Sequence, residues 1–353
     1  MTRAETSPSS SNDKPKRPVS IRGVAEHAGV SIATVSRVLN SPELVSPSTA
    51  ERVQRAVREL GYRPNLFAKS LLTRRSRVIG VSLPDIHGEF YAELMHNADR
   101  RACERGYHLL VSSNAHHPDD GPQNGFALDL VDGLIVMLTE RVRVDLDAIA
   151  SLDIPVAVIG VDPPGMPVET IICDNTIGAA RATEHLLDAT TPERCFFVGA
   201  HVGNLDSDQR AAAFASVLGR HGHEPNPHQI AHGEFSFEWG GEWAMDRCDE
   251  GTLAGSAVLA ANDEIALGIV NAARQRGLEV PRDLRIVGFD DSRICSLLRP
   301  KLSSVRVPVD EMAREAVDAL IRCLEEPGST PRHIRLATTL VVRDSSRTAP
   351  ENP

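Results

Sequence analysis

The chain has 353 residues, 41% of them apolar and 4% aromatic, and a formal net charge of −10. This composition supports a hydrophobic core, and no run reaches the roughly 18 apolar residues that a membrane-spanning helix needs. Residues 1–18 lack the apolar core of a signal peptide and are rich in Ser, Pro and Lys, so we expect a disordered tail and a cytoplasmic protein.

Charge is distributed unevenly along the chain. Residues 1–77 carry 14 Lys and Arg against 6 Asp and Glu, whereas the remainder carries 24 against 42. The acidic total alone argues against a nucleic-acid partner, but a basic head on an acidic body favours polyanion binding by the head. Because neutralised phosphates release counterions, such binding should weaken steeply with salt.

The basic head predicts three short helices, over residues 21–28, 32–39 and 47–60. Ser20 and Ser31 are N-cap candidates for the first two helices, and Gly29 supplies the left-handed residue between them. Pro47 stands at the first position of the third helix, and Gly61 closes it. Two short helices joined at a glycine form a helix-turn-helix.

The second helix has an outer face of short or hydrogen-bonding side chains with one cation. Such a face suits the major groove, where hydroxyls bond phosphates and an Arg pairs with guanine O6 and N7. A solvent-facing helix with Ser and Thr as caps is the alternative, which the glycine turn and basic charge disfavour. The residues are Ser31, Ile32, Ala33, Thr34, Ser36, Arg37 and Asn40.

Residues 65–71 follow Pro64 and form a segment too short to be a stable helix alone in water. It therefore needs a partner or DNA to order it, or it is a plain linker. Residues 73–77 are a basic, polar joint to the body.

From residue 77 onward, Val- and Ile-rich strand patterns alternate with helical ones, which predicts parallel sheets covered by helices on both faces. The number of units exceeds one ordinary sheet, so we expect two similar lobes with a cleft between them. The candidate strands are 78–83, 108–112, 133–138, 156–160, 195–199, 257–261 and 284–289, and the candidate helices are 90–105, 177–187, 208–221, 263–276 and 310–324.

Ligands of such sheets bind at the carboxyl ends of the strands, and the polar residues of the body follow the predicted strands. Carboxylates and amides there suit a ligand with several hydroxyls. Helix N-caps are the alternative, and Asp263 in particular fits that role. The positions are Asp85 and His87, Asn114, Asn262 to Glu264, and Asp290 with Asp291.

The head resembles the lactose-repressor (LacI/GalR) family over residues 24–31, 34–40, 61–65 and 68–71. The resemblance implies that Ile32 and Ala33 choose bases, that Arg37 reads a guanine, and that Ser31, Thr34 and Ser36 hold phosphates. It also implies a hinge helix that pairs with its dimer mate in the minor groove, where Leu71 wedges into the central base step. Asn65 and Ala68 are the other hinge contacts.

The resemblance extends over the body, to about residue 347, through residues 206–210, 260–268, 287–291 and 340–343. It implies the fold of the periplasmic sugar-binding proteins. The effector contacts that it implies are Phe90, Arg210, Phe235, Asn262 and Asp290. The sequence departs from the family at 88–91, where Asn-Pro-Phe-Phe is usual, at Gly160, where Asp is usual, and at 116–130, which is short for a helix.

Cysteine and histidine patterns indicate no metal site, disulfide framework or cofactor. Six cysteines include no CxxC pair, so buried reduced thiols are expected. The sequence contains no GxGxxG, GxxxxGK or HExxH, and the His pairs at 116–117 and 221–223 fit a solvated surface.

We therefore predict a non-enzymatic, homodimeric transcription regulator, by family default a repressor, that binds a pseudo-palindromic operator and a sugar-like effector. The predicted division is a tail over 1–18, the helix-turn-helix over 19–64, the hinge over 65–77, the body over 78–347 and a C-terminal tail over 348–353. That last segment contains no leucine heptad, which favours dimers over tetramers. A solute-binding transport protein and a sugar-modifying enzyme are the rival interpretations.

Overall fold

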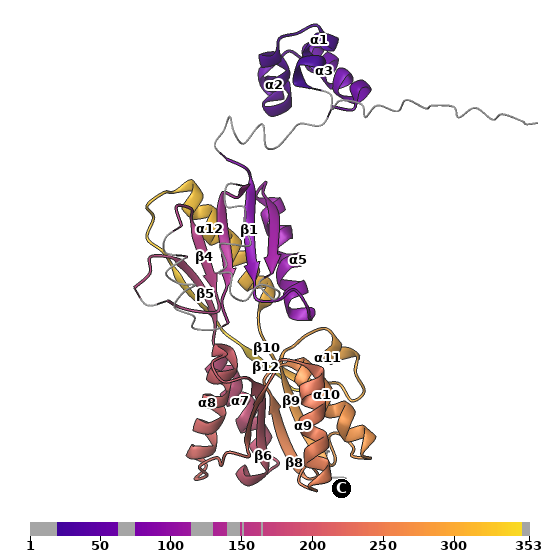
Figure 1. Cartoon of the computed structure of the whole chain (residues 1–353), viewed down its shortest axis with the longest axis vertical. Coiled ribbons are helices and arrows are strands. Elements are labelled where there is room, and N and C mark those ends of the chain that lie inside the picture. Colours follow the sequence, from indigo (N-terminus) through magenta and orange to yellow (C-terminus); the bar gives the residue numbers. More distant parts are fainter. Residues whose placement is uncertain are drawn as a thin grey trace, which may run out of the picture. The chain divides into compact units, whose positions relative to one another are not determined.

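The structure is a computed structural model that describes residues 20–62, 75–113, 130–139, 149, 152–163 and 165–347 (Figure 1). The chain divides into two compact units, Met1–Ser76 and Arg77–Pro353, called here the head and the body. Within the described residues, no helix is long and apolar enough to cross a membrane.

The head contains α1 (Ile21–Ala28), α2 (Ile32–Asn40), a 3-10 turn (Pro42–Leu44) and α3 (Pro47–Leu60). The predicted caps are confirmed. Ser20 accepts a hydrogen bond from the Gly23 amide and Ser31 accepts one from Thr34, while Gly29 has a φ of 62°. Apolar residues from all three helices form the core of the head, with Val24, Val35 and Val53 fully buried.

The body contains two six-stranded sheets, which confirms the prediction of two lobes. The first sheet has the order β11-β5-β4-β3-β1-β2, and all its strands are parallel. Its strands are β1 (Val78–Leu83), β2 (His108–Ser113), β3 (Gly133–Met137), β4 (Val156–Ile159), β5 (Glu169–Cys173) and β11 (His333–Leu336).

The second sheet has the order β12-β10-β9-β8-β6-β7, in which only the pairing of β12 with β10 is antiparallel. The antiparallel edge departs from the prediction of parallel strands. The strands are β6 (Cys195–Ala200), β7 (Ile230–Gly233), β8 (Ser256–Ala260), β9 (Leu284–Asp290), β10 (Ser303–Arg306) and β12 (Thr339–Val341).

Helices pack on both sheets. In the second lobe, β7 is added on one side of β6, and β8 and the later strands are added on the other side. With right-handed crossovers, this order places α8 on one face of the sheet and α9 and α10 on the other. Figure 1 shows these two groups on opposite sides of the strands, with α7 beside α8. The helices are α5 (Glu89–Glu104), α7 (Asn175–Leu187), α8 (Leu205–Arg220), α9 (Phe237–Asp249), α10 (Asp263–Gln275), α11 (Ile294–Leu297) and α12 (Val309–Glu325).

The chain passes between the lobes after β5, after β10 and after β11. The helix α12, which follows β10 of the second sheet, returns to the first lobe and packs beside α5. Two of the crossing segments bond to each other, because the Thr338 hydroxyl donates to the Asp174 carbonyl at 2.7 Å and the Asp174 amide donates to the Leu336 carbonyl at 2.9 Å.

Every strand and helix predicted for the body is present, with ends shifted by up to three residues, but seven strands and helices of its described residues were missed. The clearest case is α9, which contains the pair Gly240 and Gly241. A Cβ on Gly240 would meet the backbone of Ile265 in α10, and one on Gly268 would meet the Phe237 carbonyl. The glycines allow α9 and α10 to pack closely, and the same glycines weaken the helical pattern in the sequence. The other missed elements are β5, β7, β10, β11, β12 and α11.

Candidate functional site

The outer face of α2 carries the predicted DNA contacts of the head. Ile32 is 44% exposed, Ala33 and Arg37 are exposed, and Thr34 is half-buried. The Ser31 hydroxyl accepts from the Thr34 amide at 3.1 Å and lies 2.8 Å from the Thr34 hydroxyl. The face thus presents one guanidinium and paired hydroxyls beside short apolar side chains.

The opposite face of α2 fixes the helix to the head. Val35 and Val38 are buried there. His27 of α1 lies 2.8 Å from Glu59 of α3 and joins the two flanking helices. Ser36 is half-buried on α2. The side chain of Asn40 lies outside the described part of the structure, as do the hinge residues Asn65, Ala68 and Leu71.

The body contains a cavity of about 420 Å³, lined by residues of both lobes. It lies at the carboxyl ends of the strands, where a doubly wound sheet places its ligands. The first lobe contributes residues at the ends of β1 and β3 or directly after them, and the second contributes residues at the ends of β6, β7, β8 and β9 or after them. In each sheet these include the neighbouring strands at which the order reverses, β1 with β3 and β6 with β8.

All five residues predicted to contact an effector line this cavity. Phe90 comes from the start of α5, Arg210 from α8, and Phe235 from the loop before α9. Asn262 lies between β8 and α10, and Asp290 is the last residue of β9. The residues that the resemblance implied, up to 200 positions apart in the chain, thus line one cavity.

Arg210 is held rigidly at the wall of the cavity. Its side chain is 6% exposed, and its Nε donates to Asn175 Oδ1 at 2.9 Å. One terminal nitrogen donates to the Ala261 carbonyl at 2.5 Å, and the guanidinium carbon lies 3.7 Å from the ring centroid of Phe289. These bonds occupy two of the five guanidinium N–H groups, which leaves others for a ligand.

The residues after β8 divide their roles differently from the prediction. It is Asn262, and not Asp263, that caps α10, since its Oδ1 accepts from the Ile265 amide at 2.9 Å. Asn262 therefore caps the helix and also lines the cavity. Asp263 is 2% exposed, and the interpretation that it serves only as a cap is wrong.

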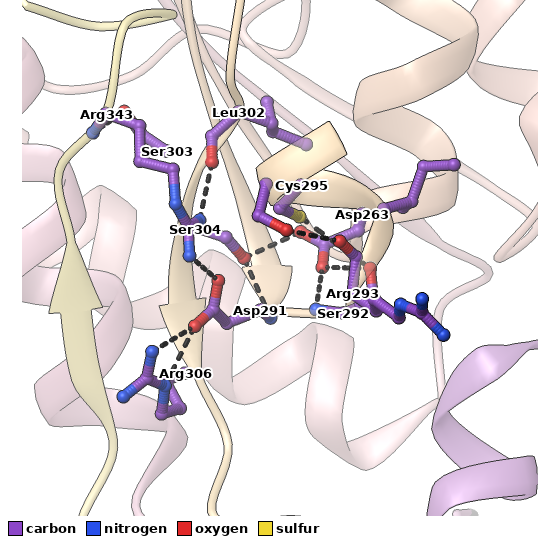
Figure 2. A network of polar contacts seen from close by, with 12 residues as sticks. Asp263, Asp291, Ser292, Arg293, Cys295, Leu302, Ser303, Ser304, Arg306 and Arg343 are labelled. Carbon is purple, nitrogen blue, oxygen red and sulfur yellow. Dashed lines mark hydrogen bonds and ion pairs between the residues drawn. The ribbon is translucent and has the colours of Figure 1, made fainter. Parts of the chain in front are cut away.

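Asp263 is the centre of a polar network that holds the end of β9 (Figure 2). One carboxylate oxygen accepts from the amide and hydroxyl of Ser292, both at 2.8 Å, and the other accepts from the Ser304 hydroxyl at 2.6 Å. Ser304 in turn accepts from the Asp291 amide at 3.0 Å. Burial raises the pKa of Asp263 to about 6, although these hydrogen bonds act in the opposite direction.

The two consecutive carboxylates at the end of β9 point to different partners. Asp290 lines the cavity, whereas Asp291 pairs with Arg306 at 2.8 Å and Arg343 at 2.6 Å (Figure 2). Both residues have a positive φ, 106° for Asp290 and 57° for Asp291, which is strained for residues other than glycine. A Cβ at Gly288 would collide with the Asp263 carboxylate, so a glycine in β9 leaves room for that side chain.

Sequence reasoning missed several residues of the cavity wall, among them Tyr91, Met137 and Thr139. Tyr91 lies among carboxylates: burial raises the pKa of its phenol, and the charges of Asp206, Asp85, Asp290 and Glu264 raise it further. The neighbouring Phe90 and the helical position of Tyr91 could have pointed to it. Met137 ends the fully buried strand β3, Thr139 follows it, and neither carries a distinctive signal.

Direct contacts join the lobes at the edge of the cavity. Glu89 of α5 accepts a hydrogen bond from the Ile294 amide of α11 at 3.3 Å. The Leu205 amide at the start of α8 donates to the Thr139 carbonyl at 2.8 Å. The two lobes therefore meet around the cavity in this structure.

Two family departures have a structural account. Gly160 has a φ of 95°, and a Cβ there would lie 2.5 Å from the Leu138 carbonyl oxygen, so this position accommodates glycine best. At 88–91, Gly88 lies close to Glu264 of the other lobe. The segment 114–129, which includes Asn114, lies outside the described residues. Within the described ranges, no three His, Cys, Asp or Glu side chains are grouped to hold a metal ion.

A helix-turn-helix head and a two-lobed body with a cavity between its sheets define a DNA-binding regulator with a ligand-binding domain. Comparison with known proteins agrees. Residues 20–65 match the bacterial regulatory proteins of the lacI family, and residues 183–346 match the periplasmic binding protein-like domain.

The chain belongs to the LacI family of transcription regulators. It is 33% identical to the HTH-type transcriptional regulator AscG of Escherichia coli over 91% of this chain and 96% of that protein. A lac repressor dimer bound to operator and the anti-inducer ONPF is 26% identical, with a TM-score of 0.81 over 94% of this chain and all of the other. A complex of the regulator CelR with cellobiose is 27% identical, with a TM-score of 0.68 over 93% and 99% of the two chains.

Proposed function

We propose that the protein is a homodimeric repressor that binds a pseudo-palindromic operator and is controlled by a small effector in the cavity of the body. It acts in the cytoplasm, on chromosomal DNA, and by binding rather than catalysis. Residues 19–64 bind the operator, and residues 65–77 connect the head to the body and respond to the effector as a hinge. Residues 78–347 bind the effector and form the dimer.

The observation that carries this proposal is the cavity, which joins six separate segments of the two lobes. A ligand that contacts Phe90 of the first lobe and Arg210, Phe235, Asn262 and Asp290 of the second bridges the lobes, and so stabilises one relative position of them. The related lac repressor and CelR structures, solved with small ligands, support this role for the cavity.

In the head, Arg37 reads a guanine and the hydroxyls of Ser31, Thr34 and Ser36 hold phosphates, with Asn40, Asn65 and Ala68 as further contacts. Ile32 and Ala33 cannot donate hydrogen bonds from their side chains. They therefore contact thymine methyl groups or accept several bases. Two heads in successive major grooves require half-sites related by the two-fold axis of the dimer.

Genomic footprinting of the full chain tests the proposal, because the genes beside its sites name the regulated pathway and so the effector. Metabolites of that pathway are then added to operator complexes. The Asp290→Ala variant should lose the effector response and keep its operator affinity. An intact response would contradict the assignment of Asp290, and sedimentation at the mass of four chains would contradict the dimer.

Coupling between the sites must be reciprocal, so an effector that changes operator affinity by a given factor has its own affinity changed by the same factor. Measuring effector affinity with and without operator DNA gives both the sign and the size of this coupling. A ratio of one would contradict control by the cavity.

A further inference from the structure

Among the described residues that line the cavity of the body, six carry a carboxylate, one carries a guanidinium and one an imidazole. The acidic side chains come from both lobes, and the cations are Arg210 and His87. The carboxylates belong to Asp85, Glu89, Asp206, Asp263, Glu264 and Asp290.

Half of these carboxylates are occupied by donors that the protein provides. Asp85 is bonded to the His87 ring at 2.8 Å, Glu89 accepts from the Ile294 amide, and Asp263 accepts from Ser292 and Ser304. Three others remain, Asp206, Glu264 and Asp290, and they face a single buried cation. Among the described lining residues the carboxyl groups therefore outnumber the cations, and burial raises the pKa of Asp290 and of Glu264.

The remaining three differ in how much of their bonding capacity is used. Asp206 accepts one hydrogen bond, from Asn175 Nδ2 at 2.7 Å. For the side chains of Glu264 and Asp290, the described part of the chain supplies no hydrogen-bond donor within bonding distance. Carboxylates at a cavity wall are usually hydrogen-bonded, and a ligand with donor groups can bond to these two.

Aromatic rings complete the same wall. Phe90 and Tyr91 lie edge to face, with ring centroids 5.5 Å apart and planes at 88°, and Phe235 faces the cavity from the other lobe. The face of an aromatic ring attracts a cation, and an ammonium group also donates to carboxylates. Rings and carboxylates in one wall therefore favour the same type of ligand.

We propose that the effector carries a protonated amine, held by Asp206, Glu264 and Asp290 against the aromatic rings, and that the cavity rejects phosphorylated and acidic metabolites. The cavity of about 420 Å³ admits an amino sugar or a short amino alcohol. This inference rests on the proposed function, since it assigns the chemical class of the effector.

The first test compares probes that share a skeleton and differ in charge. Glucosamine, glucose and glucuronate form one series, and 4-aminobutan-1-ol, butane-1,4-diol and 4-hydroxybutanoate form another. Each probe is added at equal concentration to the full chain, and the rise in melting temperature reports binding. In each series the amine should give the largest rise. Equal rises, including no rise for any probe, or a larger rise for a neutral or acidic member overturn the proposal.

The second test removes one charge without changing shape. Asp206→Asn keeps an acceptor for Asn175, and its affinity for the preferred amine should fall about 10- to 100-fold, the range for a hydrogen bond to a charged group. Asp208→Asn is the matched control, because Asp208 lies in the same helix and bonds to the Gly203 amide instead of lining the cavity. Melting temperatures without probe show whether each variant folds, and Glu264→Gln replaces Asp206→Asn if that variant does not.

The outcomes separate this inference from the proposed function. If the preferred amine binds the Asp206→Asn variant as tightly as it binds the Asp208→Asn control and the parent chain, the charge assignment is wrong. If the preferred probe is neutral or acidic but Asp290→Ala still abolishes its binding, the cavity remains the effector site and only the amine is refuted. Probe binding that survives Asp290→Ala unchanged contradicts the proposed site itself.

Discussion

Replacing Asp263 by Asn should remove a pH dependence of stability that this buried carboxyl imposes on the second lobe. Its pKa is raised from 3.8 to about 6, because burial outweighs the hydrogen bonds from Ser304 and Ser292. Between these two pH values the folded state binds more protons at this position than the unfolded state. The contribution of Asp263 is therefore fully present below pH 3.8 and is lost as the pH rises through 6.

The size of the effect follows from the pKa difference. A shift of about two units corresponds to about 3 kcal/mol in the free energy of unfolding. Asn has the same shape and does not titrate. Its oxygen can accept from the Ser292 amide, while its nitrogen donates to the Ser304 hydroxyl, which still accepts from Asp291. The free energy of unfolding of the parent chain minus that of the variant should therefore fall by about 2 kcal/mol between pH 4 and pH 7.

Urea unfolding followed by tryptophan fluorescence is the appropriate assay. The two tryptophans of the chain, Trp239 and Trp243, both lie in α9 of the second lobe, so the signal reports the lobe that contains Asp263. Asp208→Asn serves as the control for changes in total charge. A difference that grows with pH would refute the reasoning, because it would mean that the hydrogen bonds outweigh burial and lower the native pKa.

Three further predictions concern Gly288 and the DNA contacts. Gly288→Ala should lower the free energy of unfolding of the second lobe by about 1–3 kcal/mol, since the added Cβ collides with Asp263. An unchanged urea midpoint would show that the Asp263 side chain can move aside. Arg37→Lys should lose about 1–3 kcal/mol of discrimination between bases at one operator position, because Lys lacks the planar guanidinium that bonds guanine at two atoms. Competition with single-base operator variants measures this discrimination, and an unchanged value would show that Arg37 does not read a base. Leu71→Ala should weaken operator binding and leave effector affinity alone; equal operator affinity in the variant would rule out the wedge.

Local signals predicted the head well. The caps Ser20 and Ser31 and the left-handed Gly29 act within a few residues of sequence, and the structure places each of them as predicted. The strands β3, β4 and β8 are fully buried apolar runs, which owe their pattern to burial on both faces, whereas β2 is largely exposed. Such elements need no knowledge of distant partners.

The missed elements depend on distant partners. The helix α9 contains glycines that are favourable only because α10 packs against them. The strand β5 begins with Glu169, a charged residue that is 1% exposed because Arg322 of α12 and the Arg332 amide bind it. A single sequence shows the unfavourable residue and not the contact that compensates for it.

The cavity wall also contains a choice between two adjacent residues that the local sequence could not predict. From sequence alone, Asp290 and Asp291 are equivalent polar residues after a predicted strand. The positive φ at both positions turns the backbone sharply, and Arg306 and Arg343 take up the carboxylate of Asp291. Asp290 is left facing the cavity because its neighbour is neutralised by residues 15 and 52 positions further along the chain. Which of two adjacent carboxylates meets a ligand is therefore decided by β10 and by the segment after β12, and not by the local sequence.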